Sequence, residues 1–162
     1  MPDDKAALYR DLAEQFAALL EGETDPIANA ANLVALIYHG LRDLNWAGFY
    51  FTRAGELVLG PFQGKPACVR IPWGQGVCGT AAARGESVVV PDVHEFPGHI
   101  TCDPVSRSEL VVPLIVNGNV LGVLDLDSPV PGRFDDGDRA GCERLAAIFV
   151  AHQQRYSAGL AL

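Results

Sequence analysis

Apolar residues recur every three or four positions in two stretches near the start of the chain, and this spacing predicts two amphipathic helices. The first is expected over residues 4–20, with apolar positions at Leu8, Leu12, Phe16 and Leu19. The second is expected from Pro26 to about Tyr38, because Asp25 is a typical N-cap and proline fits the first helical position. Its inward-facing residues are expected to be Ile27, Leu33, Leu36 and Ile37.

From Asn45 the apolar period changes to two, which predicts β-strands. Alternation assigns two sets of residues in the first strand to opposite faces: Trp46, Gly48 and Tyr50, and Ala47, Phe49 and Phe51. Further elements are expected as strands over 56–62, 67–71, 87–90, 109–116 and 120–127, a short helix over 80–84 and a closing helix over 135–156. This order predicts an α+β fold, with helices packed on one mostly antiparallel sheet.

A long loop over residues 91–107 interrupts the strands and carries three prolines, two histidines and a cysteine. Loops of this length are usually functional or disordered, and the apolar residues Phe96 and Ile100 argue against disorder. We expect one domain over residues 1–162. Its parts would be N-terminal helices (4–40), a sheet with this lid loop (45–127) and a C-terminal helix (135–156).

Charge and composition narrow the class of function. The 162 residues carry a formal net charge of −8 without a basic stripe, which argues against nucleic acid or an anionic membrane as partner. The N-terminus is acidic where a signal peptide is basic and then apolar, and no apolar run approaches the ~20 residues that span a bilayer. We therefore expect a cytoplasmic protein whose thiols are reduced at rest.

Three of the four cysteines, Cys68, Cys78 and Cys102, lie beside turns or strand ends. The nearest pair, Cys68 and Cys78, is ten residues apart with no histidine between them, which argues against a zinc site. We expect no bound metal or cofactor. Reversible thiol chemistry needs an attacking thiolate and a second thiol that resolves the sulfenic acid. The loop position of Cys102 favours reactivity, whereas Cys68 and Cys78 are equally compatible with simple burial. Cys142 is expected to pack on the apolar face of the closing helix.

Asp125 and Asp127 are two residues apart on a predicted strand, so they share a face. With a three-residue turn at 117–119, Glu109 lies opposite Asp127 and three carboxylates converge; with a two-residue turn, Glu109 points to the other side. Converging carboxylates repel, so at least one should have a raised pKa and act as a general acid, while the others hold a cation such as an ammonium group. The alternative is a solvated sheet end that blocks edge pairing.

Trp46 and Tyr50 share a strand face, and Gly48 between them leaves room for a small ligand. Core packing is the more common use of such aromatic residues. On the lid loop, His94 and His99 either lower the pKa of Cys102 or are solvated loop residues.

Four segments resemble the free methionine-R-sulfoxide reductases, a family of small GAF-domain enzymes. They are GPFQGKPACVRIPWGQGVCGTAAA, DVHEFPGHITCD, SELVVPLI and GVLDLDSP. The resemblance extends from about Asn45 to Phe149. It implies a GAF fold with a six-stranded sheet and a common dimeric state.

The resemblance also implies roles for individual residues. Cys102 matches the catalytic cysteine, Cys68 the resolving cysteine and Cys78 a further redox partner, and the order in which Cys68 and Cys78 act is open. The substrate-binding residues that it implies are Trp46, Tyr50, Glu109, Asp125 and Asp127. Cys142 matches no functional position.

The expected reaction is reduction of free L-methionine (R)-S-oxide to methionine. The carboxylates would bind the α-ammonium group, which a residue inside a protein chain lacks. Glu109 or Asp125 would protonate the sulfoxide oxygen, and the Cys102 thiolate would attack sulfur and become a sulfenic acid. Cys68 or Cys78 would then form a disulfide, and thioredoxin, supplied by NADPH, would reduce it after the lid loop moves.

Two alternatives belong to other classes of function. A GAF-type sensor would bind a small ligand without chemistry, but sensors act through an output domain, which is not expected here. A dimerisation or scaffold module would tolerate loss of every loop thiol. Only the enzyme would lose free thiols when the sulfoxide is added.

Overall fold

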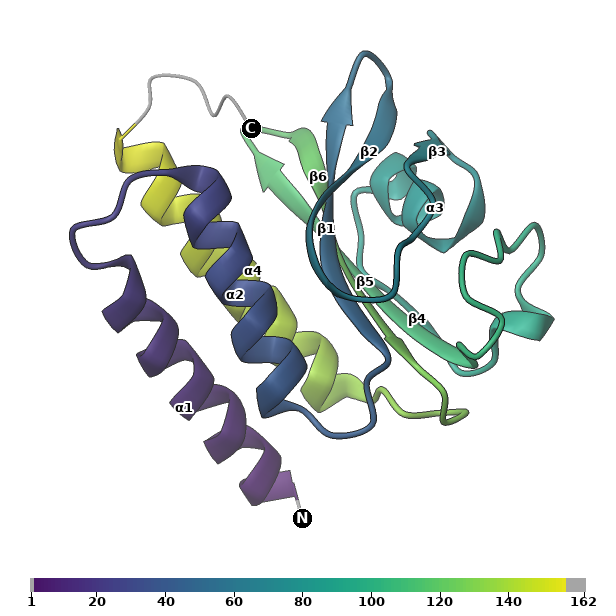
Figure 1. Ribbon diagram of the computed structural model, residues 1–162, viewed down its shortest axis with the longest axis horizontal. Helices are drawn as coiled ribbons and strands as arrows, with labels where there is room; N and C mark the ends of the chain where they lie inside the picture. The colour runs from purple at the N-terminus through teal and green to yellow at the C-terminus, as the bar shows by residue number, and fades with distance from the viewer. Residues whose placement is uncertain (1, 157–162) are drawn as a thin grey trace.

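The computed structural model describes residues 2–156, which form one six-stranded antiparallel sheet with helices on both faces (Figure 1). The strands are β1 (Trp46–Arg53), β2 (Glu56–Gly64), β3 (Arg70–Pro72), β4 (Val88–Val90), β5 (Ser108–Val116) and β6 (Asn119–Ser128), in the order β3-β2-β1-β6-β5-β4. The helices are α1 (Pro2–Leu20), α2 (Pro26–Gly40), α3 (Gly76–Arg84), the 3-10 turn η1 (Val93–Glu95) and α4 (Asp136–Tyr156). The α+β expectation is confirmed. No helix in this part of the chain is long and apolar enough to cross a membrane.

Helices α2 and α4 pack on one face of the sheet and α1 lies outside them, whereas α3 and the lid loop (residues 91–107) lie on the other face (Figure 1). The start of α2 is as expected, because the Asp25 carboxylate accepts a hydrogen bond from the Ala28 N–H at 2.9 Å. The predicted inward stripes were partly wrong: Leu8, Leu19 and Ile27 are exposed. Since α1 packs mainly against α4 and α2, it buries a narrow stripe that consists of Tyr9, Leu12, Ala13, Phe16 and Leu20.

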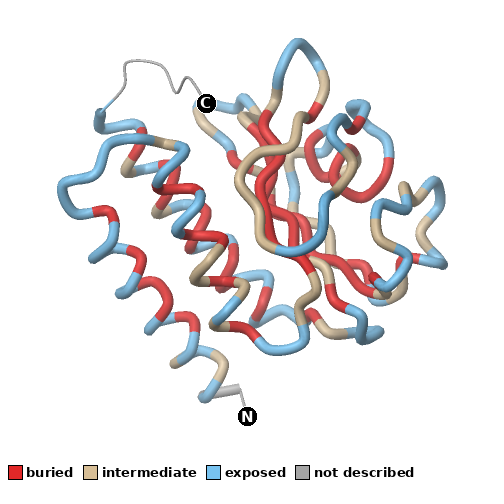
Figure 2. The backbone as a smooth tube through the Cα atoms, in the orientation of Figure 1, coloured by how far each residue is buried: buried red, intermediate tan, exposed pale blue. Residues whose placement is uncertain are grey.

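The sheet separates two apolar cores (Figure 2). Strand β1 contributes to both, as its alternation predicted. Phe49 faces α4 and packs against Phe149 with ring centroids 5.2 Å apart. Trp46 and Tyr50 face the opposite core, which is also where the buried carboxylates of β5 and β6 lie. One face of the sheet therefore holds α2 and α4, and the other holds α3 and the buried carboxyl groups.

Two predicted elements around the cysteines had wrong bounds. Strand β3 begins at Arg70, so Cys68 lies in the loop before it and not on a strand. The loop keeps one backbone hydrogen bond to β2, which the Leu59 N–H donates to the Val69 carbonyl oxygen. Helix α3 begins at Gly76, which places Cys78 in its first turn. Both cysteines lie next to one cavity, which Cys78 lines and Cys68 adjoins through its bond to Cys102.

The turn between β5 and β6 has two residues, Asn117 and Gly118, and not the three that convergence of the carboxylates was expected to need. Both have positive φ, 50° and 78°, as a tight hairpin turn requires. Leu121 is left unpaired between two regular stretches of the ladder, and this bulge shifts the register by one residue. Glu109 therefore lies opposite Asp127 despite the short turn.

Candidate active site

A small cavity lies beneath the lid loop on the face of the sheet opposite α2 and α4. Its volume is about 40 Å³. Seven of the eight predicted site residues line it: Trp46, Tyr50, Cys78, Cys102, Glu109, Asp125 and Asp127. The eighth, Cys68, joins it through a covalent bond to Cys102. The structure thus brings together side chains from three strands, one helix and two loops.

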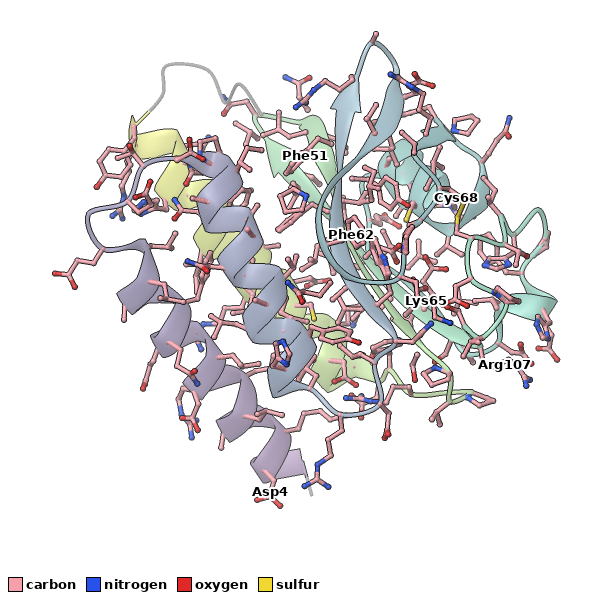
Figure 3. All side chains as sticks on the ribbon, in the orientation of Figure 1. Asp4, Phe51, Phe62, Lys65, Cys68 and Arg107 are labelled. Carbon is pink, nitrogen blue, oxygen red and sulfur yellow. A yellow bond between two sulfur atoms is a disulfide. The ribbon has the colours of Figure 1, made fainter. Side chains whose placement is uncertain are left out.

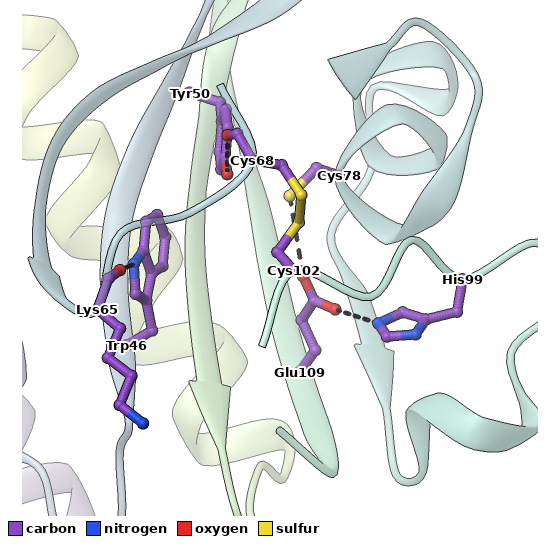
Figure 4. The surroundings of a disulfide bond; sticks show 8 residues. All are labelled: Trp46, Tyr50, Lys65, Cys68, Cys78, His99, Cys102 and Glu109. Carbon is purple, nitrogen blue, oxygen red and sulfur yellow. Dashed lines mark hydrogen bonds and ion pairs between the residues drawn. A yellow bond between two sulfur atoms is a disulfide. The ribbon is translucent and has the colours of Figure 1, made fainter. Parts of the chain in front are cut away.

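Cys68 and Cys102 form a disulfide with an S–S distance of 2.12 Å and a Cα–Cα distance of 5.5 Å (Figure 4). The bond connects the loop before β3 to the lid loop. Figure 3 shows Cys68 on the side of the sheet away from α1 and α2, on the same loop as Lys65. The Tyr50 hydroxyl donates to the Cys68 carbonyl oxygen at 2.9 Å and fixes this loop over the cavity.

Cys78 is a buried free thiol whose Sγ lies 3.8 Å from Oε1 of Glu109 (Figure 4). Burial, together with the negative charges of Asp125 and Glu109, raises the pKa of Cys78 well above its ordinary value. The thiol is therefore protonated and serves as a hydrogen-bond donor in this state. The sequence left the order of Cys68 and Cys78 open, and the geometry pairs Cys68 with Cys102.

Three carboxyl groups converge on the floor of the cavity. Burial raises the pKa of Glu109 well above its usual range, and repulsion from Asp125 and Asp127 adds to the effect. Burial also raises the pKa of Asp125, to about 6. The pKa of Asp127 is raised by burial and by the negative charges of Asp125 and Asp103. Near neutral pH the cluster thus contains both a protonated acid and a carboxylate.

No lysine or arginine of the described chain forms an ion pair with any of the three acids of the carboxyl cluster. His99 Nε2 is 3.9 Å from Oε2 of Glu109, but burial and the nearby charge of His94 lower the pKa of His99, which favours the neutral ring. Oδ1 of Asp125 is buried without a hydrogen-bond partner. An unpaired carboxylate in a cavity is suited to bind a cationic ligand group.

Trp46 forms the aromatic wall of the cavity and stacks between Tyr50 and Phe62, with centroid distances of 5.8 and 5.4 Å. Its indole N–H donates to the Lys65 carbonyl oxygen at 3.1 Å. The sequence suggested that Gly48 leaves room for a ligand above it, but this space is filled. A Cβ there would lie 2.5 Å from the Trp46 ring and 2.5 Å from Phe62, so the glycine lets the indole lie across the strand.

Several residues that hold the lid loop were missed by sequence reasoning. Asn45 Nδ2 donates to Oδ2 of Asp103 at 3.2 Å and to Oγ of Ser106 at 2.9 Å, next to the disulfide. At the base of the loop, Arg107 pairs with Asp92 at 3.1 Å. Single polar residues without a motif give no signal in a sequence, since their partners are up to 61 positions away.

The two histidines of the lid loop differ in position. His99 lines the cavity, whereas His94 is exposed and lies outside it. Cys142, as expected, is buried in α4 on the other side of the sheet. Of the two histidines, only His99 lines the site, and His94 acts on it only through the pKa of His99.

Comparison with known proteins agrees with this geometry. The GAF domain family model matches residues 3–152. The free methionine-R-sulfoxide reductase of Escherichia coli is 55% identical over 144 residues, which are 89% of this chain and 87% of that protein.

Two solved structures are similar throughout. The free methionine-R-sulfoxide reductase from Neisseria meningitidis in complex with its substrate has a TM-score of 0.89 and 46% identity, over 93% of this chain and 90% of that one. A putative GAF sensor protein from Burkholderia vietnamiensis has a TM-score of 0.92 and 60% identity, over 96% of this chain and 99% of that one.

Proposed function

This chain belongs to the GAF-domain family of free methionine-R-sulfoxide reductases, and we propose that its cavity reduces free methionine-R-sulfoxide with Cys102 as the nucleophile. The protein is an oxidoreductase of that family. The observation that carries the assignment of Cys102 is the Cys68–Cys102 disulfide at a cavity that is lined by three carboxyl groups, two of them buried. A disulfide at this place is the product that a sulfoxide leaves when two thiols reduce it.

The first step transfers oxygen from substrate to enzyme. The Cys102 thiolate attacks the sulfoxide sulfur while a carboxyl group donates a proton to the sulfoxide oxygen. We assign the donor to Glu109, because its raised pKa keeps it protonated near neutrality. The attack forms a bond between Cys102 Sγ and the substrate sulfur. The protonated oxygen then shifts from the substrate sulfur to Sγ, so that the substrate's S–O bond and the new Sγ–S bond both break, methionine leaves, and Cys102 becomes a sulfenic acid. Sulfur of the substrate is reduced by two electrons and that of Cys102 is oxidised by two.

The second step closes the disulfide. The Cys68 thiol attacks the sulfenic sulfur of Cys102, and the oxygen leaves as water. Cys78 is a weaker nucleophile for this step, since its raised pKa keeps the thiol protonated. An external dithiol, which we propose to be thioredoxin, then reduces the disulfide by thiol exchange, and movement of the lid loop exposes the bond.

Selection for the free amino acid follows from the charges. Asp125, with its unpartnered oxygen, and Asp127 would bind the α-ammonium group, and Trp46 and Tyr50 would pack against the methionine side chain. A methionine sulfoxide inside a peptide has an amide in place of the ammonium, so it would leave a buried carboxylate unpaired. A homodimer and a cytoplasmic location stay predictions.

The test is NADPH consumption with thioredoxin and thioredoxin reductase. Free methionine-R-sulfoxide, its S epimer and a peptide-bound sulfoxide are offered to the wild type, to Cys102→Ser and to the control Cys142→Ser. Turnover of the free R form alone is expected, lost in Cys102→Ser and kept in the control. Turnover by Cys102→Ser would remove Cys102 as nucleophile, and equal turnover of the peptide would contradict the ammonium site.

A further inference from the structure

Cys78, Glu109 and Asp125 come from α3, β5 and β6, and each brings one potential ligand atom within 4.8 Å of the other two. We propose that these three side chains form a reversible binding site for a thiophilic divalent metal ion such as Zn²⁺. The proposed inhibition by that ion rests on the function proposed above. The binding itself does not, because the site is present while Cys68 and Cys102 are joined in the disulfide.

The ligand types fit this metal. Zn²⁺ binds cysteine thiolate and carboxylate oxygen, and three protein ligands with water in a fourth position are a common arrangement. Zn–S and Zn–O bonds of about 2.3 and 2.0 Å at a tetrahedral angle place the sulfur and oxygen about 3.5 Å apart. Cys78 Sγ and Glu109 Oε1 are 3.8 Å apart, so a shift of a few tenths of an ångström completes that edge.

The charges also call for a cation. Glu109 and Asp125 are buried, exposed by only 6% and 5%, and no lysine or arginine within residues 2–156 pairs with either. Bound protons reduce the negative charge instead, since burial raises the pKa of both acids and of the Cys78 thiol. A divalent ion would displace these protons. A second, independent observation is that Oδ1 of Asp125 is buried without a hydrogen-bond partner, so this oxygen is free to bind a metal ion.

The thiol determines which ions the site would prefer. Mg²⁺ and Ca²⁺ take oxygen ligands, so a site that needs thiolate favours Zn²⁺, Co²⁺ and related ions over them. A bound ion would occupy the place of the substrate's ammonium group at Asp125 and of the proton on Glu109. It would therefore block the enzyme competitively until a chelator removes it.

Co²⁺ titration of the oxidised protein tests the binding directly, because the disulfide removes Cys68 and Cys102 as ligands. One equivalent of Co²⁺ should produce a thiolate-to-cobalt charge-transfer band, release protons and be displaced by Zn²⁺ but not by Mg²⁺. The band should vanish in Cys78→Ser and persist in Cys142→Ser, the other buried free thiol. Asp125→Asn should weaken binding at least tenfold. Absence of the band in the wild type, or its persistence in Cys78→Ser, would overturn the proposal.

Inhibition is measured separately on the reduced enzyme. Zn²⁺ should raise the apparent KM for the sulfoxide, and a chelator should restore it. If the metal-free protein shows no turnover, the proposed function fails while the Co²⁺ result still decides the metal site. If Co²⁺ binds and Zn²⁺ does not inhibit, the site exists but does not overlap the substrate, and the competitive block is wrong.

Discussion

Two buried clusters in this molecule combine a free cysteine with acidic side chains, and they differ in their cations. Between α1 and α4, the fully buried Asp138 carboxylate contacts Lys5 Nζ at 2.9 Å, Arg133 Nη1 at 3.1 Å and the Tyr9 hydroxyl at 2.8 Å. The same hydroxyl lies 3.8 Å from Cys142 Sγ. Every strong acceptor in this cluster has a donor, so the cluster stabilises the packing of α1 on α4 and leaves nothing to bind a ligand.

The cavity cluster has the opposite balance. Cys78, Glu109, Asp125 and Asp127 meet without a lysine or arginine, and an oxygen of Asp125 has no partner. Burying acids in this way costs stability, because each must either keep its proton or carry an uncompensated charge. Compensated buried charge supports structure, and uncompensated buried charge marks a site that a ligand completes.

The largest contrast is expected between Asp138→Asn and Asp125→Asn. Asp138→Asn leaves two cations beside a neutral amide and should cost about 3–5 kcal/mol of unfolding free energy, measured by urea denaturation. Its activity per folded molecule should stay within about twofold of the wild type. Asp125→Asn should reverse the pattern, with unchanged or higher stability and kcat/KM lower by about 100-fold, or roughly 2.7 kcal/mol. If Asp125→Asn destabilised the protein as much as Asp138→Asn, the two clusters would not differ in role.

Substrate affinity should depend on the protonation of Asp125, whose pKa is raised to about 6. Below that pH the carboxyl takes up a proton and no longer attracts the ammonium group. Affinity should therefore fall up to about tenfold per pH unit as the pH decreases. Calorimetric titration of Cys102→Ser with the sulfoxide isolates binding from thiolate chemistry. A Cys102→Ser/Asp125→Asn double variant should bind weakly with little pH dependence, and a slope kept there would assign the effect to another group.

The free energy of unfolding should decrease as the pH rises, because Glu109 binds a proton more tightly in the folded protein. Its pKa is raised in the folded protein, so above the unfolded value the native state holds more protons than the unfolded state. Wild-type stability should fall by up to about 1.4 kcal/mol per pH unit over the window between the two pKa values. Glu109→Gln should reduce that slope to the part that Asp125 and Asp127 contribute, and its stability relative to the wild type should be higher at pH 8 than at pH 5. Parallel wild-type and Glu109→Gln curves would contradict the raised pKa.

The smallest effect is expected for Cys142→Ala. The Cys142 thiol makes only a weak contact with Tyr9, and burial raises its pKa to about 12, so it is inert. Stability should change by about 1 kcal/mol and turnover should not change. Thermal unfolding and the coupled NADPH assay measure both. Loss of turnover in this variant would show that the helix-side thiol takes part in the chemistry.

Local signals in the sequence were sufficient for several features. The period of two from Asn45 correctly separated Trp46 and Tyr50 from Phe49 and Phe51, because adjacent side chains of a strand point to opposite faces. Asp25 and Pro26 fixed the start of α2 through a local hydrogen bond. The motifs, through their resemblance to one family, predicted the cysteines and acids of the site. The cavity contains or adjoins all of these residues.

Other features depended on contacts between distant residues. The hairpin after β5 has the short turn that was expected to separate Glu109 from Asp127, and a bulge at Leu121 restores their pairing. A bulge is chosen by the packing of the whole sheet, so the turn residues alone do not reveal it. The exposure of Leu8 and Leu19 likewise depends on where α1 docks.

The sequence by itself determined which chemistry is available: three thiols near turns, three acids on strands and an aromatic pair, in an order that defines the fold. Only the tertiary structure decided how these groups share charge and protons. Pairing of Cys68 with Cys102, burial of Cys78 against Glu109, and the absence of a basic partner for Asp125 in the described chain all require distances across elements. Residue order encodes local conformation, whereas pKa and reactivity depend on which distant groups fold into contact and exclude water.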